Sequence, residues 1–171
     1  MFGLWKRKPT QDITTTLANQ AVGAQSVLYR LMTETLQAPP NSIRKLELTY
    51  FALSVLSYAF LRLAQTENKE ETLDQAVLSV LRRSLPHCGE QMAESQIVSE
   101  YQQRYSEYDA LLRPVFAHSD IDPHSCTTLL MHLYECAMQR SARRAMLTIT
   151  MASPLIVQFL ADHIDFIKKK L

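Results

Sequence analysis

The sequence predicts an all-α protein, a single-domain bundle of six or seven helices around one apolar central helix at about residues 42–65. Three observations lead to this prediction. The seven prolines separate long segments that are nearly free of glycine, of which the chain has only three. Apolar residues recur within these segments at three- and four-residue steps, as on one face of a helix. No segment shows the sustained apolar–polar alternation between hairpin turns that is typical of strands.

The composition is that of one compact domain. With 171 residues, 47% apolar and 20% charged, the chain has enough apolar material for one core. We expect residues 10–171 to form the helical domain and residues 1–9 to be a flexible N-terminal segment.

The first predicted helix covers Thr10 to Gln37, with Asp12 or a neighbouring threonine as its N-cap. The second is predicted to begin at Ser42, which follows two prolines and can act as an N-cap, and to end near Gln65.

The second helix contains an uncharged run, Leu48 to Leu61. A helix that is apolar on all sides is typical of the centre of a fold. The 14 residues of the run are fewer than the roughly 20 needed to cross a bilayer. We therefore expect a buried helix and no transmembrane segment.

The polar run 66–71 is predicted to link the second helix to a third, which ends at Pro86–Gly89. The fourth helix is expected from Glu90 to Leu112, and the fifth begins with Asp122 as its N-cap and Pro123 in the first turn.

The last helix is predicted to begin at Ser153 and Pro154, which repeat the pattern of a cap followed by proline, and to end at Lys170. The helical pattern continues without a strong stop through residues 139–146. The sequence therefore leaves open whether residues 123–152 form one helix or two.

Charge is distributed unevenly along the chain. Residues 1–64 contain 7 basic (Lys, Arg) and 3 acidic (Asp, Glu) residues, residues 65–122 contain 5 and 11, and residues 123–171 contain 6 and 3. The formal charges of the three segments are therefore +4, −6 and +3. Two interpretations stay open: acidic helices that pack beside basic ones, or a polarised surface that orients a partner. The formal net charge of +1 and the lack of a basic surface interleaved with aromatic residues argue against nucleic-acid binding.

The three cysteines are widely spaced and odd in number, which predicts reduced thiols. The N-terminus lacks the order of a signal peptide, because its basic residues follow its apolar ones. We therefore expect a cytoplasmic protein.

Histidine and cysteine side chains gather between His118 and Cys136. His132 and Cys136 share a helix face, and Glu135 lies three residues from His132. Zinc sites usually show paired short spacings, and a packing stripe explains Cys136 equally well. The sequence therefore predicts no metal and no cofactor, and no combination of residues identifies an enzyme.

Two groups of residues are candidates for partner binding. The first is a tyrosine face on the fourth helix, although a half-buried core face explains the same spacing. It consists of Tyr101, Tyr105 and Tyr108.

The second group is a set of arginines at three- and four-residue steps, predicted to share one helical face and to suit an acidic partner. It consists of Arg140, Arg143 and Arg144. A solvated surface is the alternative.

From these patterns we expect a noncatalytic helical protein–protein interaction module, such as an adaptor, an inhibitor or an immunity-type partner. The partner is expected to be a protein, and a homo-oligomer stays open. The alternatives are an apolar-ligand or lipid-binding bundle, in which the second helix lines a cavity, and a metal-dependent enzyme that uses the region 118–136.

Overall fold

The computed structural model describes residues 10–88, 91–117 and 121–170, and within them it contains six α-helices and no strand. This confirms the all-α prediction. The predicted flexible segment 1–9 and the residue His118 lie outside the described residues. The helices are α1 (Thr10–Arg30), α2 (Lys45–Leu63), α3 (Lys69–Cys88), α4 (Glu94–Val115), α5 (Pro123–Met138) and α6 (Met146–Lys170).

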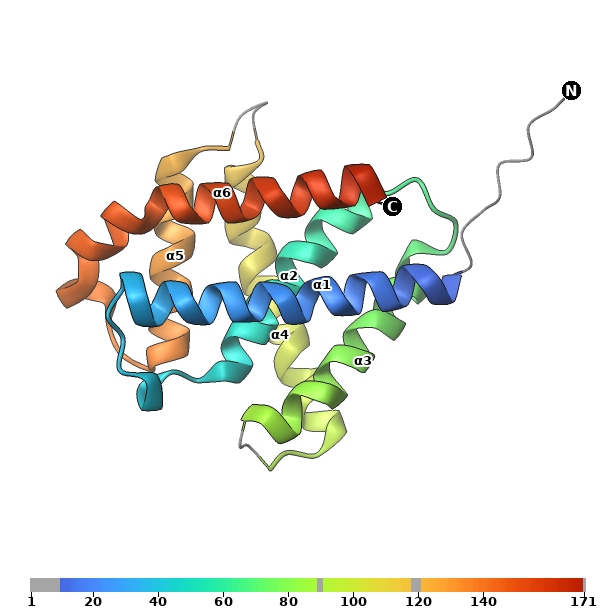
Figure 1. Cartoon of the computed structure of the whole chain (residues 1–171), viewed down its shortest axis with the longest axis horizontal. Helices are drawn as coiled ribbons and strands as arrows, with labels where there is room; N and C mark the ends of the chain where they lie inside the picture. The colour runs from blue at the N-terminus through green and yellow to red at the C-terminus, as the bar shows by residue number, and fades with distance from the viewer. Residues whose placement is uncertain (1–9, 89–90, 118–120, 171) are drawn as a thin grey trace, which may run out of the picture.

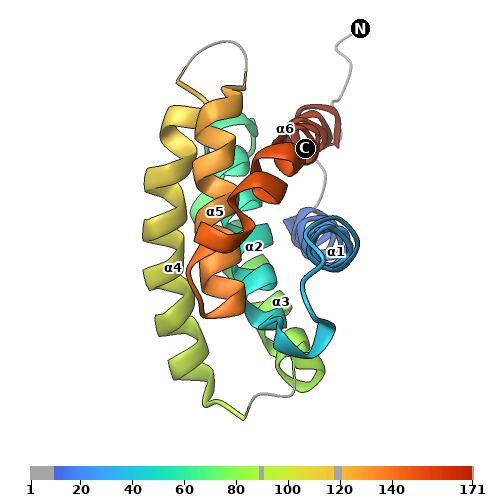
Figure 2. The same cartoon turned by 90° about the vertical axis from the view of Figure 1, so that its left-hand side faces the viewer.

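Helix α2 lies in the middle of the bundle. Every residue from Leu46 to Phe60 is buried, and α2 packs against each of the other five α-helices. Figure 2 shows α4 on one side of α2 and the helices α1 and α6 on the other. Burial on all sides follows from the composition of this helix, because apolar side chains occupy nearly all of its surface.

Helices α1 and α6 cross the same side of the bundle and run antiparallel to each other (Figure 1). α1 packs mainly against α2 and α3, whereas α6 packs mainly against α5 and α2. A groove remains between α1 and α6, and it is described with the candidate sites below.

Three predicted helix starts are wrong. The fourth helix, α4, begins at Glu94 rather than at Glu90, and residues 91–93 are not helical. Ser42 lies in a short 3₁₀ turn, η2 (Pro40–Ser42), and α2 begins at Lys45 without a side-chain cap. The last helix begins at Met146 rather than at Ser153, and Pro154 lies inside it. A proline inside a helix removes one backbone hydrogen bond, at a cost of about 3 kcal/mol. The buried residues Ile149 and Ile156 on either side of Pro154 stabilise the continuous helix by packing.

The start of α5 agrees with its prediction, because the Asp122 carboxylate accepts hydrogen bonds from the backbone N–H groups of His124 and Ser125. The helix ends at Met138, where Gln139 adopts a left-handed conformation with φ of 50°. A 3₁₀ turn, η3 (Ala142–Ala145), then leads into α6. Residues 123–152 therefore contain all of α5 and the start of α6.

Two stretches of the described chain are long and apolar enough to cross a membrane by length and composition: Lys45–Leu63 and Ala142–Lys170. The bundle buries 83% of the first, as is typical of a core helix, but only 33% of the second. Length and composition do not separate a membrane span from a core helix, so the expected absence of a transmembrane segment stays a prediction.

Candidate functional site

The predicted tyrosine face of α4 points mostly into the bundle. Tyr101 and Tyr108 are buried, while Tyr105 is half-buried. The Tyr101 hydroxyl lies 3.1 Å from the hydroxyl of Ser57 on α2. The Tyr108 hydroxyl donates a hydrogen bond to the carboxylate of Glu47, which also lies on α2. The fold thus uses two of the three tyrosines internally.

A buried carboxylate, that of Glu47 on α2, lies between α2 and α4. It accepts hydrogen bonds from the Tyr108 hydroxyl at 2.8 Å and from Arg104 Nε at 3.1 Å, and Arg44 lies 3.8 Å away. Burial raises the pKa of Glu47 above its ordinary value, against the opposing effects of Tyr108 and Arg104.

Two arginines connect this carboxylate to the acidic helix α4. Arg44 forms a bidentate ion pair with Glu100 at 2.7 and 2.9 Å. Arg104 contacts both Glu47 and Glu107, at 3.1 and 2.7 Å. Part of the acidic charge of the middle segment is therefore neutralised inside the molecule, as one of the two interpretations of the charge distribution expects.

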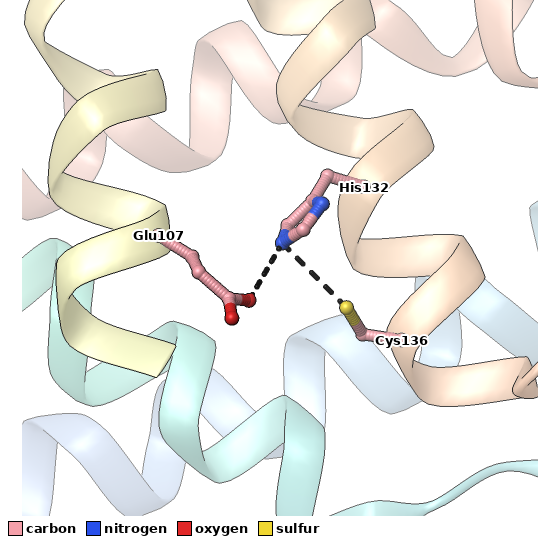
Figure 3. A group of neighbouring side chains, drawn as sticks. All are labelled: Glu107, His132 and Cys136. Atoms are coloured by element: carbon pink, nitrogen blue, oxygen red, sulfur yellow. Dashed lines mark hydrogen bonds and ion pairs between the residues drawn. The ribbon is translucent and has the colours of Figure 1, made fainter. Parts of the chain in front are cut away.

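Three side chains with metal-binding atoms meet at the edge of this network: Glu107 from α4, and His132 and Cys136 from successive turns of α5 (Figure 3). His132 Nε2 lies 3.3 Å from Glu107 Oε2 and 3.6 Å from Cys136 Sγ. The three donor atoms lie within 4.8 Å of one another, and all three residues are half-buried.

Hydrogen bonds orient this cluster. Besides Arg104, Gln103 donates to the Glu107 carboxylate at 3.2 Å. Although burial acts in the other direction, these bonds hold the pKa of Glu107 below its ordinary value. Burial, followed by the charge of Glu47, raises the pKa of the Cys136 thiol to about 11.

The cluster does not have the geometry of a nucleophilic triad. In such a triad the acid and the nucleophile contact different nitrogens of the histidine, so that a proton can pass between them. Here the same atom, His132 Nε2, faces both Glu107 and Cys136.

The other described residues of the 118–136 region that have metal-binding atoms do not lie in the cluster with His132. Glu135 accepts the backbone N–H of Ala142 at 2.8 Å and so stabilises the turn after α5. Cys126 is buried near the start of α5, and His124 is exposed there. Sequence reasoning missed Glu107, because no local spacing connects it to a helix that begins 16 residues later.

The predicted arginine face is not one face. The left-handed residue Gln139 ends α5, so Arg140 lies in the following loop, while Arg143 and Arg144 belong to η3. The Arg140 guanidinium donates to the Tyr134 hydroxyl at 2.8 Å. Arg143 and Arg144 are exposed, and no acidic side chain among the described residues pairs with either.

The start of α6 exposes an apolar surface beside Arg143 and Arg144. Leu147 and Met151 are 76% and 74% exposed, and Met146 and Leu155 are also exposed. A stripe of exposed residues continues from there along α6, at steps of four and three, and its middle part (Leu155, Gln158 and Asp162) borders the groove described next. We call it the outer stripe; its members are Leu147, Met151, Leu155, Gln158, Asp162 and Asp165.

A groove of about 420 Å³ lies between α1 and α6. Val27 and Leu28 of α1 and Leu155 and Phe159 of α6 line it. Polar residues complete the lining, among them Gln20 of α1 and Gln158, Asp162 and His163 of α6. His163 is 4% exposed; its Nδ1 lies 2.6 Å from the Phe159 carbonyl, while its Nε2 has no described hydrogen-bond partner. Burial lowers the pKa of His163. Helix α2, which would line the cavity under the alternative of an apolar-ligand-binding bundle, contributes no residue to this groove.

Comparison with protein-family models, with curated proteins and with solved structures finds no match to this chain. The assignment of a function therefore depends on the geometry of the described residues.

Proposed function

We propose that the protein is a noncatalytic protein–protein interaction module and that the outer stripe of α6 is its contact surface. The observation that carries this proposal is the exposure of Leu147 and Met151, at 76% and 74%, on adjacent turns of one helix. Single exposed apolar residues are normal on a protein surface, but a contiguous apolar patch rimmed by polar residues is typical of an interaction site.

The two arginines beside the patch support the same proposal. Arg143 and Arg144 lie in the turn that leads directly into α6. A cation at the N-terminal end of a helix is unfavourable, because the helix dipole is positive there. These arginines therefore do not serve the stability of the fold, and a binding role explains their position.

The charges along the outer stripe favour a second copy of this chain as the partner. Arg143 and Arg144 precede the stripe, its apolar residues follow, and it ends at two exposed carboxylates. Asp162 accepts a hydrogen bond from Gln158, and Asp165 forms an exposed ion pair with Lys169. Antiparallel pairing of two α6 helices would place Arg144 opposite Asp162 of the second copy. Met151 would then lie opposite Leu155 of the second copy. Because the two copies are related by a two-fold axis, each of these contacts occurs twice in the dimer. A helix of 25 residues is roughly 38 Å long, which gives room for both contacts on each side.

Charge-swap variants test this pairing. Sedimentation velocity of the full chain across a concentration series should show a dimer that Met151→Glu abolishes. Arg144→Glu and Asp162→Arg should each weaken the dimer about tenfold or more, and the double variant should restore it. Gln102→Glu, which changes the charge of an exposed position on α4, on the other side of α2, is the control and should leave the dimer unchanged.

A wild-type chain that stays monomeric at all concentrations would reject self-association. If that monomer also bound vesicles of anionic phospholipid through Leu147 and Met151, the exposed surface would be a lipid-contact surface and the interaction-module proposal would be wrong.

Binding of a small apolar ligand is a second candidate function. The groove between α1 and α6 favours it, because apolar side chains such as Val27, Leu28 and Phe159 form part of its lining. The unpartnered His163 Nε2 can accept a hydrogen bond from a ligand hydroxyl. Calorimetric titration with dodecanol should show saturable binding that is weakened by Val27→Lys, a change at an exposed position of the groove. Equal binding by the variant would reject this candidate.

A further inference from the structure

We propose that Glu107, His132 and Cys136 bind one Zn²⁺ ion. This proposal does not depend on the outer stripe of α6. Helix α4 supplies the carboxylate, and α5 supplies the imidazole and the thiol one helical turn apart (Figure 3). Carboxylate oxygen, imidazole nitrogen and thiolate sulfur are the three donor types that Zn²⁺ prefers in proteins.

The distances between the donor atoms fit a tetrahedral zinc ion. Bonds of about 2.1 Å to nitrogen and oxygen and about 2.3 Å to sulfur give separations of about 3.4 Å for nitrogen to oxygen and about 3.6 Å for nitrogen to sulfur. The observed separations from His132 Nε2 are 3.3 Å to Glu107 Oε2 and 3.6 Å to Cys136 Sγ. The Glu107 oxygen and the Cys136 sulfur lie within 4.8 Å of each other, and side-chain rotation can bring them to the separation of about 3.6 Å of a tetrahedral site.

Hydrogen bonding to His132 Nε2 satisfies only one of its two neighbours. His132 Nε2 carries either one proton or one lone pair, so it can form a good hydrogen bond with only one of its two neighbours at a time. A metal ion, in contrast, binds the nitrogen, the oxygen and the sulfur together. The convergence of three donor atoms on one point is what metal coordination requires.

The surroundings of the cluster hold the ligands in position. Arg104 and Gln103 fix the Glu107 carboxylate, and the ring of Tyr108 packs edge-on against the ring of His132, with centroids 5.4 Å apart. Such contacts orient metal ligands before the ion arrives. Because all three residues are half-buried, water has access to the fourth coordination position.

The charges also balance. On binding, the Cys136 thiol releases its proton to solvent, and the resulting thiolate and the Glu107 carboxylate neutralise the two positive charges of the ion. Arg104, which donates to Glu107 Oε2, keeps Glu47 as its own counter-charge, while Glu100 neutralises Arg44.

Metal titration of the full chain tests the site. Protein stripped with a chelator is incubated with one equivalent of zinc sulfate, desalted and analysed for zinc. The wild type should retain one zinc per chain, and His132→Gln and Cys136→Ala should each weaken binding more than about 100-fold, because loss of a direct ligand costs more than loss of an outer contact. Two changes on the same helix, His124→Gln and Cys126→Ala, are matched controls and should retain the ion.

Cobalt provides a readout that needs no variant. Co²⁺ bound to the wild type should show a thiolate-to-cobalt charge-transfer band together with the strong visible bands of a tetrahedral site. A wild type that retains no zinc, zinc retained in both His132→Gln and Cys136→Ala, or a cobalt spectrum without the thiolate band would each overturn the proposal.

Discussion

The carboxylate of Glu47 on α2 accepts a 2.8 Å hydrogen bond from the Tyr108 hydroxyl on α4, across a sequence separation of 61 residues. Glu47 is 0% exposed. A carboxylate in such a position is stable only when hydrogen bonds and charges compensate for the loss of water. Tyr108 and Arg104 supply them, so this contact couples the central helix to the acidic one.

We expect Tyr108→Phe to destabilise the fold, because it leaves part of a buried carboxylate without a donor. The free energy of unfolding should fall by about 1–3 kcal/mol, and the melting temperature by roughly 2–4 °C for each kcal/mol. Thermal melting, monitored by circular dichroism, measures the melting temperature and the free energy of unfolding. Tyr105→Phe is the control, because that half-buried hydroxyl has no described hydrogen-bond partner, and it should melt like the wild type.

The pH dependence of stability should report the titration of Glu47. Burial raises the native pKa of Glu47 above the ordinary value of 4.5, so the native state holds this proton more tightly than the unfolded chain does. The stability contributed by Glu47 is therefore fully present below pH 4.5 and is lost as the pH rises through the native pKa. Glu47→Gln removes this titration.

Denaturant unfolding at a series of pH values measures the difference in stability between wild type and Glu47→Gln. We expect the stability of the wild type, relative to that of Glu47→Gln, to be constant below pH 4.5 and to fall as the pH rises above it. A difference that grows with pH would mean that the charges of Arg104 and Arg44 outweigh burial and lower the pKa of Glu47.

Leu53→Asp should prevent folding. Leu53 is buried in α2, where a charged side chain without a partner costs several kcal/mol, compared with a total stability of roughly 5–15 kcal/mol for a domain. Circular dichroism should show loss of helix. Leu147→Asp places the same side chain on the exposed surface of α6 and should keep the helical spectrum; equal spectra for both variants would contradict the central position of α2.

Reversal of Arg143 and Arg144 to glutamate should leave the fold intact or slightly stabilise it. Neither guanidinium has an acidic partner among the described residues, and a negative charge before α6 suits the helix dipole by about 0.3–1 kcal/mol per residue at low salt. Thermal melting at low salt, at a protein concentration at which the chain is monomeric, is the measurement. A clear fall in melting temperature would instead reveal an acidic partner within the same molecule.

Short-range sequence patterns predicted the helices well where a local interaction decides their ends. The capping of α5 by Asp122 is such a case, since its hydrogen bonds reach only two and three residues along the chain. The same patterns failed at Pro154, where a local rule predicts a helix start but the packing of α6 against its neighbours maintains a continuous helix.

The sequence by itself determined the all-α class and the helix-forming segments, because apolar periodicity, capping and proline act over a few residues. Only the tertiary structure decided which side chains meet. It buried Tyr101 and Tyr108, brought Glu107 to His132 and Cys136, and left the start of α6 exposed. The physical reason is that such contacts join residues far apart in the chain, and the packing of whole helices, rather than any local spacing, sets their distances.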